Sequence, residues 1–237
     1  MKIHFLVLFC LFQSLQMFGQ GLIRGKILDH TTSEPIPGVN IYLNNSQIGT
    51  VSEIDGSFSL EVLFEGNVKL FFSHIGFKTI QATVDVSKVK SLKVLLEEDD
   101  TQLSEVEVSA RRDKTWERQL KKFERLFLGN DKFARSCEIL NPWVIEFQET
   151  RQRFSATAGQ VLNIQNNATG YKVAYYLEDF ILEDDMILYN GLASFQSLEP
   201  ADRTQFVSWE KNRKSAYNGS FAHFLKSVLD DQVEANG

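Results

Sequence analysis

The pattern of hydrophobic and polar positions changes period along the chain and so divides it into regions. From Leu22 to about Leu96, short runs rich in β-branched and aromatic residues are separated by turn residues every 8 to 12 positions or so. This spacing is typical of an all-β sandwich. The expected strands, about seven, are Leu22–Leu28, Val39–Leu43, Ile48–Val51, Ser57–Val62, Val68–Ser73, Lys78–Val84 and Ser91–Leu96.

Turn residues lie between these runs, and Asp55-Gly56 is the sharpest of the turn signals. Asp and Gly tolerate the positive backbone angles that a two-residue hairpin needs, so a hairpin is expected there. A calcium loop at Glu53 and Asp55 is disfavoured, because the spaced oxygen ligands of such a loop are missing.

A carboxylate-rich stretch, Glu97 to Gln102, follows the sandwich and precedes an alternating run, Leu103 to Val108, which predicts a short strand or an extended linker. A domain boundary is placed near Ala110. The expected division is a signal peptide at 1–20, the sandwich at 21–97, an acidic linker with a short strand at 98–110, and a second domain at 111–237.

The second domain begins with a helical period. Trp116, Leu120, Phe123 and Phe127 are spaced by 4, 3 and 4, which places them on one helix face, and Gly129 is a stop signal. The helix is rich in Lys and Arg, which suits either a solvated face or docking to an acidic surface or lipid headgroups. A solvated face is favoured, offset by acidic segments elsewhere such as the turn at 183–185.

After Pro142 the period becomes that of strands and then of helices again. Runs at 143–148, 154–158, 161–165, 171–180 and 186–195 predict an antiparallel meander with turns at 166–170 and 183–185. From Asp202 onward Phe206, Trp209, Arg213 and Tyr217 recur at helical intervals, followed by Phe221, Phe224, Leu225 and Val228. The second domain is therefore expected to be α+β, with C-terminal helices.

The first twenty residues have the three-part layout of a secretory signal peptide. Met-Lys is followed by an apolar run, which is too short to span a bilayer as a helix, and then by a more polar segment up to Gln20. Cleavage is expected after Gly19 or Gln20. Cys10 lies inside the apolar run behind a bulky residue, which argues against a lipoprotein. The exported chain would keep Cys137 as its one cysteine and so have no internal disulfide. The protein is thus expected to be periplasmic or associated with the outer membrane.

Composition and charge restrict the classes of partner that the protein is expected to bind. The chain has 237 residues with 25 Lys and Arg against 31 Asp and Glu, a net charge of −6, so nucleic acid is a poor partner. No later stretch approaches the roughly 20 apolar residues of a membrane helix. An unidentified envelope protein is the partner that remains, and the sequence does not define an oligomeric state.

The sequence contains no motif that indicates a catalysed reaction. The sequence lacks the His-Glu-x-x-His pattern of zinc peptidases, the Gly-x-Ser-x-Gly elbow of hydrolases and the glycine-rich loops that bind nucleotides. No catalytic residue, metal ligand or cofactor site is therefore assigned. If the protein were an enzyme, Cys137, Asn212 and His223 would be the candidates, although an acid next to Cys137 opposes thiolate formation.

Aromatic and polar residues of the C-terminal helices are the candidates for binding. Aromatic rings give a large contact area at small entropic cost, but most of them are needed in a core of this size. Trp143, Trp209 and Tyr217 fit either role, and a core position is favoured. The interaction candidates are Trp209, Asn212, Arg213, Tyr217 and His223.

The sandwich region resembles a known family through several spaced motifs in order. They are Ile23–Asp29, Glu34–Ile41, Ile48–Val51, Asp55–Phe58 and Phe72–Phe77. Together they resemble the carboxypeptidase regulatory-like, or transthyretin-like, β-sandwich over about residues 21–97. Such domains accompany envelope proteins of Gram-negative bacteria, including TonB-dependent receptors, and the resemblance implies no catalytic residue.

The rest of the chain departs from those receptors, since a helix around Trp116 stands where their plug domain would begin. Its recognisable stretches are Cys137–Pro142, Trp209–Arg213, Ala216–Ser220 and His223–Lys226. Through them it resembles the second region of uncharacterised secreted proteins in which more chain follows, so the natural protein is expected to continue beyond Gly237. The favoured function is a non-catalytic secreted envelope protein, with the sandwich as a docking module and the second domain for binding or assembly. Two alternatives stay open: an accessory to a TonB-dependent transporter, and an enzyme whose site lies in the second or a further C-terminal region.

Overall fold

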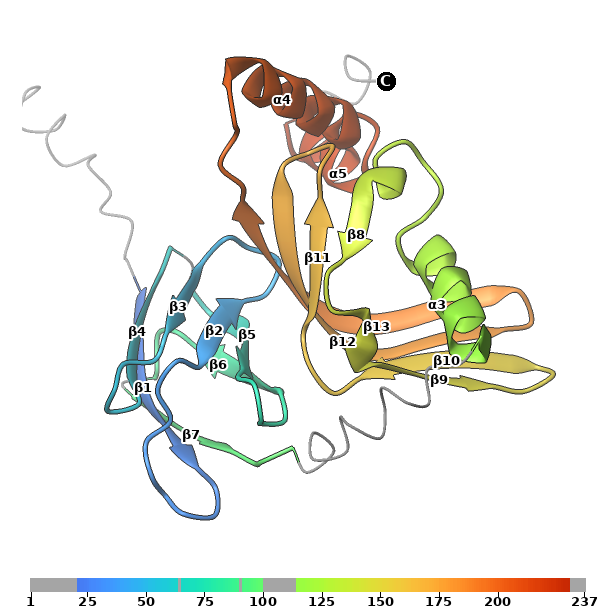
Figure 1. Cartoon of the computed structure of the whole chain (residues 1–237). Coiled ribbons are helices and arrows are strands. Elements are labelled where there is room, and N and C mark those ends of the chain that lie inside the picture. The colour runs from blue at the N-terminus through green and yellow to red at the C-terminus, as the bar shows by residue number, and fades with distance from the viewer. Residues whose placement is uncertain (1–20, 64, 90, 100–113, 231–237) are drawn as a thin grey trace, which may run out of the picture.

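The computed structural model describes residues 21–63, 65–89, 91–99 and 114–230, and it has a β-sandwich followed by an α+β domain (Figure 1). The predicted signal peptide at 1–20 lies outside the described residues. So does most of the predicted linker, including the expected strand at 103–108.

The sandwich consists of two sheets around one apolar core. One sheet has the order β4-β1-β7, in which β1 and β7 are parallel, and the other has the order β3-β2-β5-β6. Inward-facing side chains such as Ile23, Ile27 and Leu70 are fully buried between the sheets, which is what period-two alternation requires. The strands are β1 Gly21–Asp29, β2 Asn40–Leu43, β3 Gly49–Val51, β4 Ser57–Val62, β5 Asn67–Ser73, β6 Ile80–Asp85 and β7 Leu92–Leu96.

These seven strands confirm the predicted sandwich, but the two-residue hairpin at Asp55-Gly56 is wrong. The chain crosses there from β3 in one sheet to β4 in the other, so the two strands are not hydrogen-bonded neighbours. Gly56 has a φ of 76°, and a Cβ on it would lie 2.5 Å from the carbonyl oxygen of Ile27. A tight turn also closes here, because the amide of Gly56 donates to the carbonyl of Glu53 at 2.9 Å and the amide of Glu53 donates to that of Ser57 at 2.8 Å. Glycine is therefore needed both for the positive φ of this turn and for its close approach to β1.

The predicted amphipathic helix is α3, Lys114–Phe127, and it packs its aromatic face on the sheet of the second domain. Phe123 is fully buried at the centre of this contact. Its ring stacks on Phe127 at 4.9 Å between centroids and meets Phe180 edge-on at 5.1 Å. The 4-3-4 spacing therefore marked the buried face correctly.

The sheet of the second domain has six strands, and β12 pairs with three of the others (Figure 1). Its first half pairs with β11 and its second half with β10, while β13 pairs with it along its whole length. The strands are β8 Cys137–Ile139, β9 Ile145–Glu149, β10 Arg153–Ala158, β11 Leu162–Asn166, β12 Tyr171–Glu183 and β13 Met186–Ser197. Short 3-10 helices precede β8 and β9, at Ala134–Ser136 and Pro142–Val144.

The expected meander is therefore wrong in its order, although the sheet is antiparallel as predicted. In a meander β10 would pair with β11, but β12 separates them in the order β8-β11-β12-β10-β9. With 13 residues, β12 is long enough to accept two shorter strands end to end. A bulge between Leu177 and Asp179 separates its two pairing segments. The strand β8 was not predicted, and Trp143 precedes β9 instead of beginning it.

The two C-terminal helices are α4, Arg203–Tyr217, and α5, Phe221–Leu229. Each begins at a side-chain cap: the carboxylate of Asp202 accepts a hydrogen bond from the amide of Gln205, and the hydroxyl of Ser220 accepts one from that of His223. Between them Gly219, at φ 81°, turns the chain. The onset predicted at Asp202 is thus its N-cap.

The sandwich is joined to the second domain by backbone hydrogen bonds as well as by the chain. The loop after β2 lies along β13, where the amide of Asn45 donates to the carbonyl of Ala193 at 2.6 Å and the amide of Phe195 donates to that of Ser46 at 2.8 Å. Beside this contact Phe71, fully buried on the outer face of β5, packs in one cluster with Val161 and Leu192. The sandwich thus docks on the second domain through its β3-β2-β5-β6 sheet.

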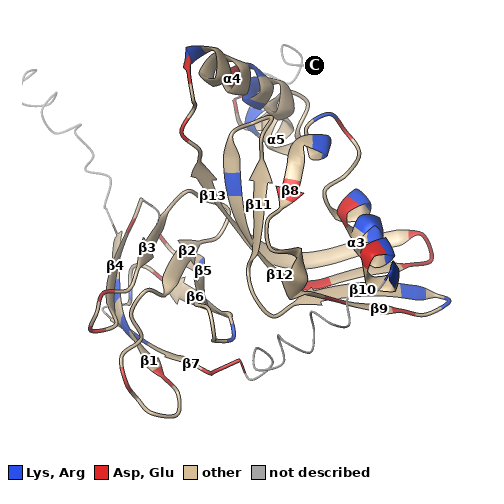
Figure 2. Cartoon of the chain, viewed as in Figure 1, with Lys and Arg blue, Asp and Glu red and all other residues tan. Residues whose placement is uncertain are grey.

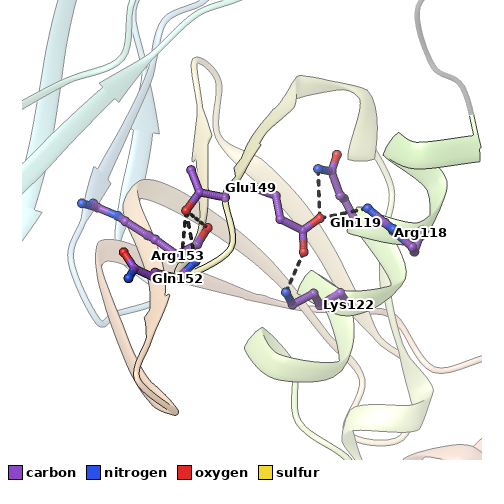
Figure 3. Close-up of polar contacts among 7 residues, drawn as sticks. Arg118, Gln119, Lys122, Glu149, Gln152 and Arg153 are labelled. Atoms are coloured by element: carbon purple, nitrogen blue, oxygen red, sulfur yellow. Dashed lines mark hydrogen bonds and ion pairs between the residues drawn. The ribbon is translucent and has the colours of Figure 1, made fainter.

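The basic face of α3 is partly neutralised by one carboxylate. Lys and Arg line this helix in Figure 2, and Figure 3 shows Arg118 and Lys122 directed toward Glu149 of β9. The carboxylate of Glu149 forms ion pairs with Arg118 at 3.0 Å and with Lys122 at 2.9 Å. These contacts, led by the Lys122 hydrogen bond, lower the pKa of Glu149. The acid that pairs directly with the helix is therefore Glu149 on β9, and Asp184 and Asp185 of the predicted acidic turn line one cavity together with Lys122.

We expect Phe123→Ala to lower the free energy of unfolding of the second domain by about 3–5 kcal/mol, because it leaves a cavity among the rings around it. All three tryptophans follow residue 110, so urea unfolding followed by tryptophan fluorescence reports on this domain. The control is Phe221→Ala, at a side chain that is 73% exposed, for which a change within about 0.5 kcal/mol is expected. Equal effects of the two changes would contradict the assigned core.

We expect Glu149→Gln to cost up to about 1 kcal/mol at pH 7, a typical value for a salt-bridge cluster near the surface. Folding lowers the pKa of Glu149, so the contacts of its carboxylate stabilise the fold at pH values above the pKa of this group in the unfolded chain. This stabilisation is lost as the pH falls through the pKa of Glu149 in the folded protein. Urea titrations at several pH values should show the wild-type advantage shrinking on acidification. Glu146→Gln, on an exposed residue of the same strand, is the control and should change the stability at pH 7 by less than about 0.5 kcal/mol.

Candidate functional site

The candidate site is built where α4 meets the turn between β11 and β12. This turn, predicted from its polar residues, is held by Asn166, whose side-chain oxygen accepts hydrogen bonds from the amides of Ala168 and Thr169. The amides of Ala168, Thr169 and Gly170 are thus bonded to Asn166, whereas the amide of Asn167 donates to the carbonyl of Ser136 at 3.0 Å. The carbonyls of four successive residues, Asn167 to Gly170, accept hydrogen bonds from another element.

Three side chains of α4 supply those hydrogen bonds. Trp209 Nε1 donates to the carbonyl of Asn167 at 2.9 Å, and Asn212 Nδ2 donates to that of Ala168 at 2.7 Å. The guanidinium of Arg213 donates to the next two carbonyls, Thr169 at 2.7 Å and Gly170 at 3.1 Å. Positions i, i+3 and i+4 share one helix face, so a single face of α4 holds the whole turn. We call this arrangement the α4 clamp.

Steric fit reinforces the α4 clamp. Trp209 is only 6% exposed and lies directly against Gly170, where an added Cβ would come within 2.2 Å of the indole ring. Gly170 also has a φ of 66°, which favours glycine. On the other side, the Arg213 guanidinium lies 4.2 Å from the centroid of the Tyr171 ring, a cation–π contact.

The remaining two interaction candidates lie beyond the clamp, where α4 passes into α5. The rings of Tyr217 and His223 are 5.0 Å apart, and His223 Nδ1 accepts a hydrogen bond from the amide of Gly219. These contacts fix the turn between the helices. All five candidates therefore belong to one connected region, in which Trp209, Asn212 and Arg213 hold α4 and the other two orient α5.

The structure adds an apolar surface on α5. Five large apolar side chains of this nine-residue helix are exposed, whereas the small Ser227 is buried. We call these five side chains the α5 face: Phe221 (73% exposed), Phe224 (53%), Leu225 (45%), Val228 (49%) and Leu229 (85%). Exposed apolar groups so concentrated are typical of interaction surfaces.

A shallow cavity of about 380 Å³ lies beside the clamp, between α4 and the 166–170 turn. Asp202, Gln205 and Asn212 contribute to its wall. Gln205 Oε1 accepts a hydrogen bond from the amide of Ala201 at 2.6 Å, and the other two side chains make the cap and clamp hydrogen bonds given above. These three side chains therefore serve the start of α4 and the clamp.

The three residues considered for catalysis each have a local partner. Cys137 Sγ contacts the carbonyl of Phe133, Asn212 belongs to the clamp, and His223 holds the helix turn. Burial, and secondarily the charge of Asp131, raises the pKa of Cys137, so its thiol form is favoured. The raised pKa was expected, but the acid responsible is Asp131, not the adjacent Glu138.

The described part of the chain has neither a metal-binding cluster nor a membrane-spanning helix. Across residues 21–99 and 114–230, apart from positions 64 and 90, no three His, Cys, Asp or Glu side chains are grouped so as to hold a metal ion. Over the same positions, no helix combines the length and the apolar character needed to cross a membrane.

Sequence reasoning selected Trp209, Asn212 and Arg213 as interaction candidates but did not foresee that they hold the 166–170 turn, and it missed the α5 face. The helical spacing of Phe221, Phe224, Leu225 and Val228 was visible, yet periodicity does not distinguish a buried face from an exposed one. The signal that could have marked the clamp is the combination of a glycine-ended polar turn with Trp, Asn and Arg at i, i+3 and i+4 on a later helix.

We expect Gly170→Ala to destabilise the second domain by at least about 2 kcal/mol, because its Cβ overlaps the Trp209 ring and its φ is positive. The matched control is Gly219→Ala, which has a similar φ of 81° but no neighbouring atom within 4 Å, and should cost only about 1 kcal/mol. Hydrogen exchange of α4 should accelerate in the first variant alone. Unchanged protection of α4 in Gly170→Ala would contradict the clamp.

Comparisons with known proteins match the N-terminal part of the chain. Residues 23–108 match the CarboxypepD_reg-like domain family. A TonB-dependent receptor of Formosa agariphila is 32% identical over 92 residues, and the TonB-dependent receptor SusC of Bacteroides thetaiotaomicron is 28% identical over 107 residues. These alignments cover 39% and 45% of this chain but only 9% and 10% of the receptors, so the chain spans about a tenth of their length.

Among solved structures, a putative carbohydrate binding protein from Bacteroides uniformis aligns with 76% of this chain and 80% of its own, at 7% identity and a TM-score of 0.27. The sequence matches agree with the seven-stranded sandwich described above and with the motifs at Ile23–Asp29 and Phe72–Phe77. The N-terminal β-sandwich of this chain is therefore a CarboxypepD_reg-like domain, the type of domain that TonB-dependent receptors carry.

Proposed function

We propose that the protein is a non-catalytic envelope protein, in which the β-sandwich is a docking module and the second domain binds a partner. The observation that carries the proposal is the α5 face, a set of large apolar side chains on a helix that the α4 clamp fixes in place. A fixed apolar helix face is the element that binds in a groove of another protein.

The geometry of α5 suits such a contact. Phe221, Phe224, Leu225 and Val228 recur at i, i+3, i+4 and i+7, which is the spacing of anchor residues in helix-in-groove recognition. Two of the anchors are phenylalanines, whose rings lie 6.4 Å apart and lose little entropy on binding. A rigid, pre-oriented helix also reduces the entropic cost of association.

The charges on the two helices specify the kind of partner. Together α4 and α5 carry five Lys or Arg residues and a single Glu, although the whole chain has a net charge of −6. A partner with an apolar groove and an acidic rim would complement this surface. We propose that it is another protein of the cell envelope.

The envelope setting is supported by the sandwich and by the predicted signal peptide. The CarboxypepD_reg-like domain is shared with TonB-dependent receptors, so the relation to such transporters favours one specific version of the proposal. In that version the protein is an accessory to a TonB-dependent transporter, and the partner bound by the α5 face is the transporter itself. The proposed location is periplasmic or outer-membrane associated.

We expect Phe224→Glu to weaken partner binding by at least about thirtyfold, as replacing a central aromatic anchor by a charge costs at least about 2 kcal/mol. The measurement is recovery of cross-linked envelope proteins from cells that produce the variant, quantified by mass spectrometry. Leu63→Glu is the matched control, because Leu63 is a similarly exposed apolar residue, but on the sandwich.

The outcome separates the versions of the proposal. Loss of the same partner in Phe224→Glu but not in Leu63→Glu supports binding through the α5 face. If that partner is a TonB-dependent receptor, the accessory role is supported; if it is another envelope protein, the accessory role is wrong. Equal recovery from both variants and the wild type would contradict the proposed binding surface.

A further inference from the structure

The outer edge of β13 is only partly covered. Its last third pairs with the sandwich, through the contacts of Ala193 and Phe195 with the loop after β2. On its inner edge the whole strand pairs with β12. From Met186 to Asn190 every residue is exposed, and within the described residues no strand is paired with their outer edge.

The exposed segment is also uncharged, which is unusual for the edge of a sheet. Natural edge strands are protected from pairing by charges, prolines or bulges. The edge strands β8 and β9 of this sheet carry Glu138, Glu146 and Glu149. The segment Met186-Ile187-Leu188-Tyr189-Asn190 carries no charge and no proline, and the bulge opposite it lies in β12.

The contacts of β13 with the sandwich indicate which backbone groups of residues 186–190 point toward the outer edge of the sheet. Ala193 and Phe195 direct their amides toward the sandwich loop. Since backbone groups alternate along a strand, Ile187 and Tyr189 direct theirs toward the same outer edge. Leu188 then occupies the closer, non-hydrogen-bonded position in any pairing made along this edge. The free edge thus continues an interface that already binds extended chain.

We propose that this edge pairs with the same edge of a second copy of the chain, as an antiparallel β13–β13 contact centred on Leu188. The exposed uncharged segment is centred on this residue. Antiparallel pairing about a twofold axis would place Ile187 opposite Tyr189 of the second copy, a β-branched and aromatic pair that is favourable in sheets. The acidic turns at Asp184-Asp185 lie at opposite ends of the contact, so the like charges do not meet.

This dimer uses a surface separate from the α5 face, so the two proposals stand independently. The residues involved belong to β13, whereas the proposed partner-binding residues belong to α5. A monomeric protein that still binds its envelope partner would overturn the dimer alone. A dimer whose Phe224→Glu variant keeps its partner would overturn the α5 proposal alone.

Disulfide trapping tests the register directly. In the full chain with Cys10→Ser and Cys137→Ser, Leu188→Cys should form a disulfide-linked dimer on mild oxidation, because residues in a non-hydrogen-bonded pair have Cα atoms about 4.5 Å apart. Leu63→Cys, an exposed site on the sandwich, should react at least about tenfold more slowly, at the rate of random collision. Equal rates at the two sites would overturn the proposal.

A charge substitution tests the same edge without a covalent bond. Sedimentation velocity should show a dimer for the wild type, and Leu188→Lys should raise its dissociation constant at least about tenfold, because it places two like charges opposite each other. Leu63→Lys should leave the dimer unchanged. A monomeric wild type, or a dimer that Leu188→Lys does not weaken, would overturn the proposal. If Leu188→Lys loses its circular dichroism spectrum, the disulfide experiment decides.

Discussion

The structure of the second domain depends on how the carbonyls of one tight turn are satisfied. Backbone carbonyls removed from water are costly without hydrogen-bond partners, and Asn166 shapes the turn by accepting hydrogen bonds from the amides of Ala168 and Thr169. The α4 clamp provides four hydrogen bonds to them from Trp209, Asn212 and Arg213. This interaction fixes α4, and through the turn at Gly219 it fixes the direction of α5.

A second set of contacts joins the second domain to the sandwich. The loop after β2 extends the edge of β13, and Phe71 fills the space beside it, so the CarboxypepD_reg-like domain is attached by backbone pairing and by an apolar contact. The same strand β12 pairs with β13 and leads out of the clamped turn. The strands β12 and β13 thereby connect the sandwich, the sheet of the second domain and the C-terminal helices. The α5 face is thus attached to the rest of the molecule through α4 and these two strands.

Local patterns predicted elements well but not their neighbours. The 4-3-4 spacing around Phe123 gave the buried face of α3, and the sandwich strands followed from period-two runs. The meander failed because β12 accepts two strands end to end, a consequence of its length that no local pattern contains. Exposure of the α5 face was missed for a similar reason, since periodicity specifies a face but not what covers it. The clamp residues were predicted as interaction candidates, whereas in the structure they bind a turn of the same chain that lies about forty positions earlier.

The central claim is that the clamped α4–α5 unit is the surface through which this protein binds an envelope partner. Cross-linking with a lysine-reactive reagent in intact cells, followed by mapping of the linked peptides, tests it most directly. The claim predicts that intermolecular links concentrate at Lys211, Lys214 and Lys226, on the two helices. Intermolecular links that leave out all three of these lysines would contradict it.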